Sequence, residues 1–268
     1  MFQKVMASIG SGGAVVDATI ADRGVRPGGV LPGQVDLVGG RVDQAVESLS
    51  VSMLAKVEVT DERGRGGVVD LPFQTLRLGG SATVRPGERQ TVPFRMTVPW
   101  EVPITTVAGQ QLAGMAVGLQ TTVEIANTVA DPQDVDAVIV EPLPAQQRIL
   151  DALGRMGYRF TTAALRKDQV RGVEQQLPFH QEIRFAPPPQ LAAMFEQVAL
   201  TFLARQQDLQ VVLDVTRVAR YGKGGGLGAV TQTEVGMFVM AHDNLAHNWE
   251  QQLTGWLGEV ARPRGIFG

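Results

Sequence analysis

Alternation of apolar and polar residues marks most of this chain as extended. The clearest run extends from Leu49 to Val59, where every second residue is apolar and most residues between them are polar. This is the pattern of a strand with one buried face. A similar run over residues 92–98 contains Pro93, which removes a backbone donor and favours an edge position or a bulge. Further strands are predicted at Val15 to Ile20, Val30 to Val38, Val68 to Leu78 and Leu112 to Ala126.

These strands follow one another through short turns rich in glycine and proline, with no helix between them. That succession indicates a β-sandwich rather than an alternating β/α sheet. Glu141-Pro142-Leu143-Pro144 is typical of a linker, and the pattern changes after it. Apolar residues then recur at helical spacing up to Met156, and Gly157 is placed to end the helix in a left-handed conformation. Short strands are predicted afterwards around Arg159 to Ala164, Glu182 to Phe185, Glu196 to Ala204, Leu209 to Ala219 and Thr231 to Ala241.

The last part of the chain predicts an amphipathic helix capped by Asp243 or Asn244. Its apolar stripe contains Leu245, Trp249, Leu253 and Trp256, which are the candidate partner-binding residues. The helix either packs on its own domain or docks on another subunit or in the groove of a partner.

Several ordered motifs give the chain a family resemblance. They are Met6 to Gly10, Val16-Asp17, Gly39-Gly40, Pro86-Gly87-Glu88, Pro93-Phe94, Pro99, Pro103-Ile104-Thr105, Ala126, Asp131-Pro132, Asp134, Asp136, Leu177-Pro178-Phe179 and Gln181-Glu182. In these motifs the chain resembles the bacterial sporulation-control family of the stage-zero M type over most of positions 2 to 220. The resemblance implies two tandem arrestin-like β-sandwich domains in a regulatory protein without a known catalytic centre. With the patterns above, it predicts a mainly all-β chain with three parts, residues 1–141, 142–242 and 243–268.

Composition narrows the class of protein further. The 268 residues carry a formal net charge of -3 and no cysteine, which leaves no disulfide scaffold, no cysteine-based zinc site and no general attraction to nucleic acid. A basic segment holds Arg155, Arg159, Arg166, Lys167 and Arg171 beside Tyr158 and Phe160. Its length favours a solvated face over a nucleic-acid surface. No signal peptide or membrane span stands out, so a cytoplasmic protein is expected.

Residues that could carry chemistry are few. His242 and His247 are five apart and do not share a helical face, and His180 is distant in sequence. The segment containing Asp131, Asp134 and Asp136 lacks the glycine and terminal glutamate of a calcium loop, and an acidic connector explains it as well. Gly224, Gly226 and Ala229 fit a dinucleotide motif. That motif binds phosphate at the N-terminus of a following helix, whereas the segment after these residues is predicted to be a strand. No cofactor, metal site or catalytic residue is therefore predicted.

Three functional hypotheses remain. The leading one is a non-catalytic cytoplasmic regulatory or scaffolding protein that contacts one or more partner proteins through sheet edges, the groove between its domains and the C-terminal helix. The partner's identity stays open, and so does self-association as a homo-oligomer. The second is a peripheral membrane-surface or lipid-binding module that uses an amphipathic segment, Phe2 to Ile9, together with the C-terminal helix. The third is an unrecognised hydrolase, whose carboxylate pairs would be assembled only by the fold.

Overall fold

The computed structural model describes residues 13–20, 24–60, 63–126, 133–220 and 229–262. The chain divides into two compact units, one formed by residues 1–141 and 165–179, the other by residues 142–164 and 180–268. The sequence predicts that residues 165–179 lie in the second domain and that the C-terminal helix forms a part of its own. In the structure, residues 165–179 belong to the first unit and the C-terminal helix belongs to the second unit.

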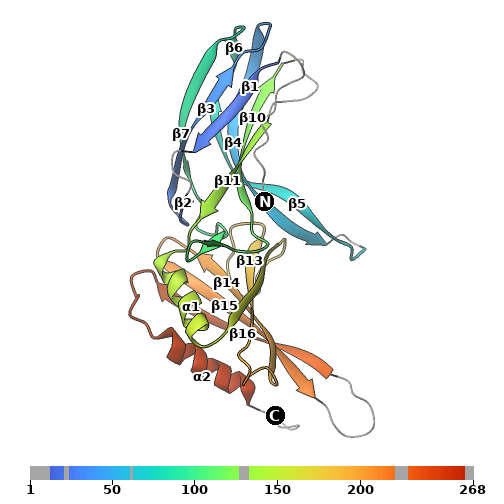
Figure 1. The fold of residues 1–268 in the computed structure, drawn as a ribbon, viewed down its shortest axis with the longest axis vertical. Coiled ribbons are helices and arrows are strands. Elements are labelled where there is room, and N and C mark those ends of the chain that lie inside the picture. Colours follow the sequence, from blue (N-terminus) through green and yellow to red (C-terminus); the bar gives the residue numbers. More distant parts are fainter. Residues whose placement is uncertain (1–12, 21–23, 61–62, 127–132, 221–228, 263–268) are drawn as a thin grey trace. The chain divides into compact units, whose positions relative to one another are not determined.

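The first unit is built from two β-sheets that face each other (Figure 1). One sheet has the order β1-β3-β7, with both pairs antiparallel. The other is built around the long strand β4, which pairs with β5, β6 and β10, while β11 continues the sheet from β10 to β2. The strands predicted at residues 15–20 and 30–38 are confirmed. The elements are β1 (Val15–Ile20), β2 (Gly24–Val25), β3 (Val30–Val38), β4 (Gln44–Thr60), β5 (Gly66–Gly79), β6 (Ala82–Val84), β7 (Arg89–Thr97), β8 (Thr106–Val107), β9 (Gln110–Gln111), β10 (Val117–Ile125) and β11 (Gln133–Val140).

The core of the first unit fills the space between the two sheets. Leu31 and Met96 are buried from the first sheet, and Met53 and Leu119 are buried from the second. Removing apolar side chains from water in this way is the main stabilisation available to a sandwich. The apolar positions of the alternating pattern therefore mark the side of each strand that faces the core.

The second unit combines one sheet with two helices. The sheet has the order β16-β15-β14-β13-β12, and the pairs from β13 to β16 are antiparallel. The short strands predicted after the linker are confirmed. The elements are α1 (Pro144–Arg155), β12 (Arg159–Arg166), β13 (His180–Ala186), β14 (Phe195–Ala204), β15 (Asp208–Arg220), β16 (Ala229–Ala241) and α2 (Trp249–Ala261).

Helix α1 ends in a Schellman motif, as the position of Gly157 predicts. Gly157 has a φ of 85°, and its N–H donates to the Gly154 carbonyl at 3.0 Å. The next N–H, of Tyr158, donates to the Leu153 carbonyl at 3.0 Å. This turn fixes where the Tyr158 side chain leaves the helix.

Helix α2 begins later than the sequence analysis predicted. Its N-cap is Asn248, whose side chain accepts the N–H of Gln251 at 3.1 Å. The cap predicted at Asp243 or Asn244 is wrong, because residues 242–243 and 245–246 form turns and Leu245 lies before the helix. Neither of the helices in the described parts of the chain is long and apolar enough to cross a membrane.

Candidate protein-binding surface

The predicted partner-binding stripe of α2 packs against its own unit. Trp249 is 4% exposed and Leu253 is fully buried, whereas Leu245 and Trp256 are half-buried. The Trp249 indole N–H donates to the Met240 sulfur at 3.2 Å. The four residues therefore do not form a shared exposed face in this structure.

One face of β16 receives the helix. The Phe238 ring meets the edges of Trp249 and Trp256 with ring centroids 6.0 and 5.8 Å apart. Gly236 makes room for Trp256, because a β-carbon at that position would lie 2.6 Å from the indole ring. Residues 236, 238 and 240 point to the same side of the strand. Helix α2 thus covers the even-numbered face of β16.

The opposite face of β16 carries three exposed apolar side chains. Val235, Met237 and Val239 are 51%, 48% and 67% exposed, and alternate positions place them side by side on one face. We call these three residues the β16 apolar strip. Sequence reasoning predicted the strand but missed the strip. The signal was present, since residues 235–241 contain no charged residue on either face.

The strip lies on an edge strand. Among the strands that the structure describes, β16 is hydrogen-bonded to β15 alone, with a register that runs without a bulge from Ala229 to Ala241. An edge strand presents unpaired backbone groups on its outer side. Here those groups adjoin the apolar strip, while α2 supports the strand from the other face.

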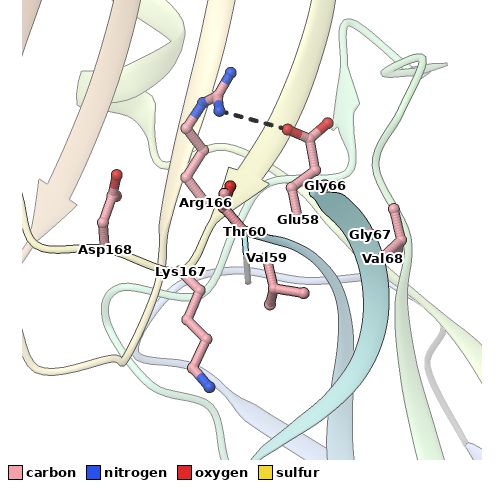
Figure 2. Close-up of a pocket in the computed structure, with 9 residues that line it drawn as sticks. All are labelled: Glu58, Val59, Thr60, Gly66, Gly67, Val68, Arg166, Lys167 and Asp168. Carbon is pink, nitrogen blue, oxygen red and sulfur yellow. Dashed lines mark ion pairs between the residues drawn. The ribbon is translucent and has the colours of Figure 1, made fainter. Parts of the chain in front are cut away.

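A polar recess of about 630 Å³ lies in the first unit, where the end of the β4–β5 hairpin meets residues 166–168. Figure 2 shows Arg166 and Glu58 pointing toward one another, and the pair is separated by 3.6 Å. Lys167 and Asp168 extend in other directions. Charges of both signs line the recess without converging on one point, so it has neither the paired carboxylates of a hydrolase nor a uniform anion site.

An ionic cluster on the second unit's sheet was also missed by sequence reasoning. Glu182 and Arg184 of β13 form an ion pair at 2.5 Å, and Asp214 of β15 lies within electrostatic range of Glu182 and His180. Burial raises the pKa of Asp214 above its ordinary value, the charge of Glu182 adds to this, and His180 opposes it. The sequence signal for this cluster was the alternation of polar residues at positions 180, 182 and 184. The order β13-β14-β15, which brings Asp214 near them, could not be predicted from the sequence.

The remaining candidate sites are placed as follows. The Asp134 carboxylate is buried and accepts the Ala18 N–H at 3.0 Å, so it links β11 to β1. Asp131, Gly224 and Gly226 fall outside the described residues, as does the segment from Phe2 to Ile9. Ala229 opens β16, as the strand prediction requires. Over the ranges that the structure describes, no three His, Asp or Glu side chains form a set that could hold a metal ion.

Comparison with known proteins identifies the family. The sequence profile of the SpoOM protein family matches residues 2–219. The chain belongs to the SpoOM protein family. The sporulation-control protein spo0M of Bacillus subtilis (strain 168) is 29% identical over 226 residues, which span 83% of each chain. The crystal structure of Spo0M from Bacillus subtilis superposes with a TM-score of 0.73 and 23% identity, covering 93% of this chain and 98% of that one.

The SpoOM assignment confirms the resemblance stated from the sequence. The mainly β fold class is confirmed as well, because the Spo0M crystal structure shares the fold over nearly its whole length. The relatives are named for sporulation control. The family name therefore connects this chain with sporulation control.

Proposed function

We propose that this chain is a non-catalytic cytoplasmic regulatory protein that acts by binding another protein along the outer edge of β16. The observation that carries the proposal is the β16 apolar strip, three neighbouring side chains about half exposed or more on an edge strand. Exposed apolar side chains that gather in one place, rather than singly, are typical of interaction sites. Membership in a family named for sporulation control supports a regulatory outcome of that contact.

The chemistry of the edge favours a partner that supplies an extended strand. Such a strand would hydrogen-bond to the outer N–H and C=O groups of β16, while its alternate side chains cover Val235, Met237 and Val239. Because the strip is uncharged, the residues that cover it are expected to be apolar. Specificity would then come from the side chains of the partner that meet this face.

Helix α2 has a supporting role in this proposal. Its two tryptophans, Trp249 and Trp256, pack on Phe238 and so hold β16 from the even-numbered face. A strand held on one face and along one edge keeps its other edge in a defined conformation, which lowers the entropy lost on binding. The apolar stripe of α2 thus packs on its own unit, which is one of the two alternatives left open by the sequence, and in this proposal it stabilises the binding edge of β16.

The test is photo-crosslinking in the bacterium that carries the protein. The residue p-benzoylphenylalanine is placed at Val239 in one strain and at Val42 in another, because Val42 of the first unit is 65% exposed and serves as a matched control. We expect a defined protein adduct at position 239 that is absent at position 42 and is lost when Met237→Glu is added. Equal adducts at both positions, or none at 239, would contradict the proposal; an adduct at twice the chain's mass would assign the edge to self-association.

A further inference from the structure

The C-terminal end of α2 lies close to the exposed edge of the second unit's sheet. The carbonyl oxygen of Arg262 accepts an Nη2–H of Arg217 at 3.3 Å. Arg217 belongs to β15, and its cross-strand partner in β16 is Gln232. Gln232 precedes Val235, the first residue of the β16 apolar strip, by three positions, which is about 10 Å of strand. The chain therefore leaves α2 near the point where the strip begins.

Arg262 turns the backbone out of the helix. Its φ of -61° and ψ of 133° are extended rather than helical. Pro263 comes next, and a proline disfavours the helical conformation in the residue before it. At the last described residue the backbone thus already has the conformation of a strand, and residues 263–268 continue from there.

The sequence of residues 263–268 suits the β16 apolar strip. These residues are Pro-Arg-Gly-Ile-Phe-Gly. Because consecutive side chains of a strand point to opposite faces, either Ile266 or Phe267 would share the face of the strip in any register. Covering exposed Val235 with one of these side chains would remove apolar surface from water.

The length of this segment decides how far along β16 it can bind. From β15 to the outer side of β16 it has to cross two strand spacings, so the direct path to a position beside Val235 is about 14 Å, and beside Val239 about 26 Å. The five residues from Pro263 to Phe267 span at most about 17 Å. Val235 is therefore within reach of the segment, and Val239 is not.

We propose that residues 263–268 bind along the outer edge of β16 beside Val235, as an added strand that runs parallel to β16. In this position they occupy part of the edge at which a partner protein is proposed to bind, so the segment regulates that site by competition. This regulatory step rests on the proposed function. A segment tethered next to its binding site has a high effective concentration, and it therefore competes even though its own contact is small.

Disulfide trapping tests the placement, because the chain contains no cysteine. Val235→Cys is combined with Ile266→Cys in one full-length variant and with Phe267→Cys in another, and both are treated with oxidised glutathione. A disulfide requires Cα atoms within about 7 Å. We expect mass spectrometry to show an intramolecular disulfide in at least one variant. Val239→Cys, at an equally exposed position out of reach, is the control and should give at least tenfold less.

Photo-crosslinking at Val239 tests the competition. In the strain that carries p-benzoylphenylalanine at this position, Ile266→Ser combined with Phe267→Ser is expected to raise the yield of the partner adduct at least twofold. Gly265→Ser introduces the same side chain into the segment without removing an apolar residue, and it is expected to leave the yield unchanged.

The outcomes separate the two proposals. Equal disulfide yields at positions 235 and 239, no disulfide at 235, or a disulfide formed only between two chains would overturn the placement of the segment. An adduct yield that does not rise in the double serine variant would overturn the competition. If the disulfide at 235 forms but no strain gives an adduct at 239, the proposed function fails, and the competition with it, while the placement stands.

Discussion

At the scale of single residues, Gly39 shows why a short glycine pair matters to this family. A β-carbon at Gly39 would lie 2.0 Å from the carbonyl oxygen of Arg85. Its N–H donates to the Glu88 carbonyl at 2.8 Å, and its carbonyl accepts the Gly87 N–H at 3.2 Å. Gly87 itself has a φ of 68°. The glycines and the Pro-Gly-Glu turn that carry the resemblance therefore serve one close backbone contact.

Replacing Gly39 by alanine should destabilise the first unit. The added carbon has no room without moving backbone, and overpacking of this kind costs about 1–3 kcal/mol. Urea unfolding followed by the amide proton–nitrogen NMR signals of β3 and β7 measures the change in the first unit. Gly80→Ala is the control, since no atom lies within 4 Å of its β-carbon position; equal losses in the two variants would show that packing at Gly39 is not the cause.

Tyr158 makes a second prediction at this scale, in alkaline solution. Burial raises its pKa to about 12, above the value of about 10 in an unfolded chain. Between these values the folded chain holds a proton that the unfolded chain has lost, so stability falls as the pH rises. Thermal unfolding from pH 8 to 11 should show a smaller loss in Tyr158→Phe than in the parent. Parallel curves for the two proteins would contradict the assigned cause.

Asp134 illustrates what sequence patterns could not provide. The segment around it was interpreted as an acidic connector or a calcium loop, yet residues 133–140 form β11. An aspartate at an inward position breaks the apolar alternation on which strand prediction depends. One of its carboxylate oxygens accepts the Ala18 N–H, 3.0 Å away on another sheet. Only the assembled sandwich supplies that donor, so the strand could not be predicted from its own residues.

At the scale of elements, α2 shows that hydrophobic periodicity can predict a helix but not the surface against which the helix packs. The spacing of Trp249, Leu253 and Trp256 correctly indicated a helix with one apolar face. Periodicity does not say which surface covers that face. The complementary signal is Gly236, whose missing side chain receives Trp256. Gly236 and Trp256 are far apart in the sequence. Their contact can be recognised only when the register of β16 is known.

Truncating Trp249 should therefore loosen the second unit. Trp249→Ala removes a buried indole and is expected to lower the free energy of unfolding by about 3–5 kcal/mol. Leu245→Ala, at a half-buried turn position, is expected to cost less, about 1 kcal/mol. Amide hydrogen exchange in β15 and β16 measures both variants. Unchanged protection of these strands in Trp249→Ala would mean that α2 does not support them.

At the scale of the whole molecule, the two units are not consecutive pieces of chain. Residues 165–179 follow the first helix of the second unit but belong to the first unit. The Glu101 carboxylate accepts the N–H groups of Gln176 and Leu177 at 2.8 and 2.9 Å. The Phe179 ring meets the edge of Phe73 with centroids 5.4 Å apart. A division of the chain into consecutive parts could not place residues 165–179 in the first unit.

Phe179→Ala should accordingly destabilise the first unit, although its position in the sequence lies beyond the linker. Phe179 is almost fully buried, and loss of such a ring costs about 3–5 kcal/mol. Hydrogen exchange is expected to rise in β4 and β5 and to stay unchanged in β15. Phe160→Ala, at an exposed ring of the second unit, is the control. Faster exchange confined to β15 would refute the grouping of residues 165–179.

The return of residues 165–179 also sets an order of events during synthesis. A ribosome delivers the chain from its N-terminus, and bacterial translation proceeds at roughly 5–20 residues per second. The first unit cannot close over Phe73 and Glu101 until the ribosome has released residue 179. By then α1 and β12 of the other unit have already emerged. The nascent chain must therefore keep a partly formed sandwich soluble for seconds, the interval in which a chaperone would find it.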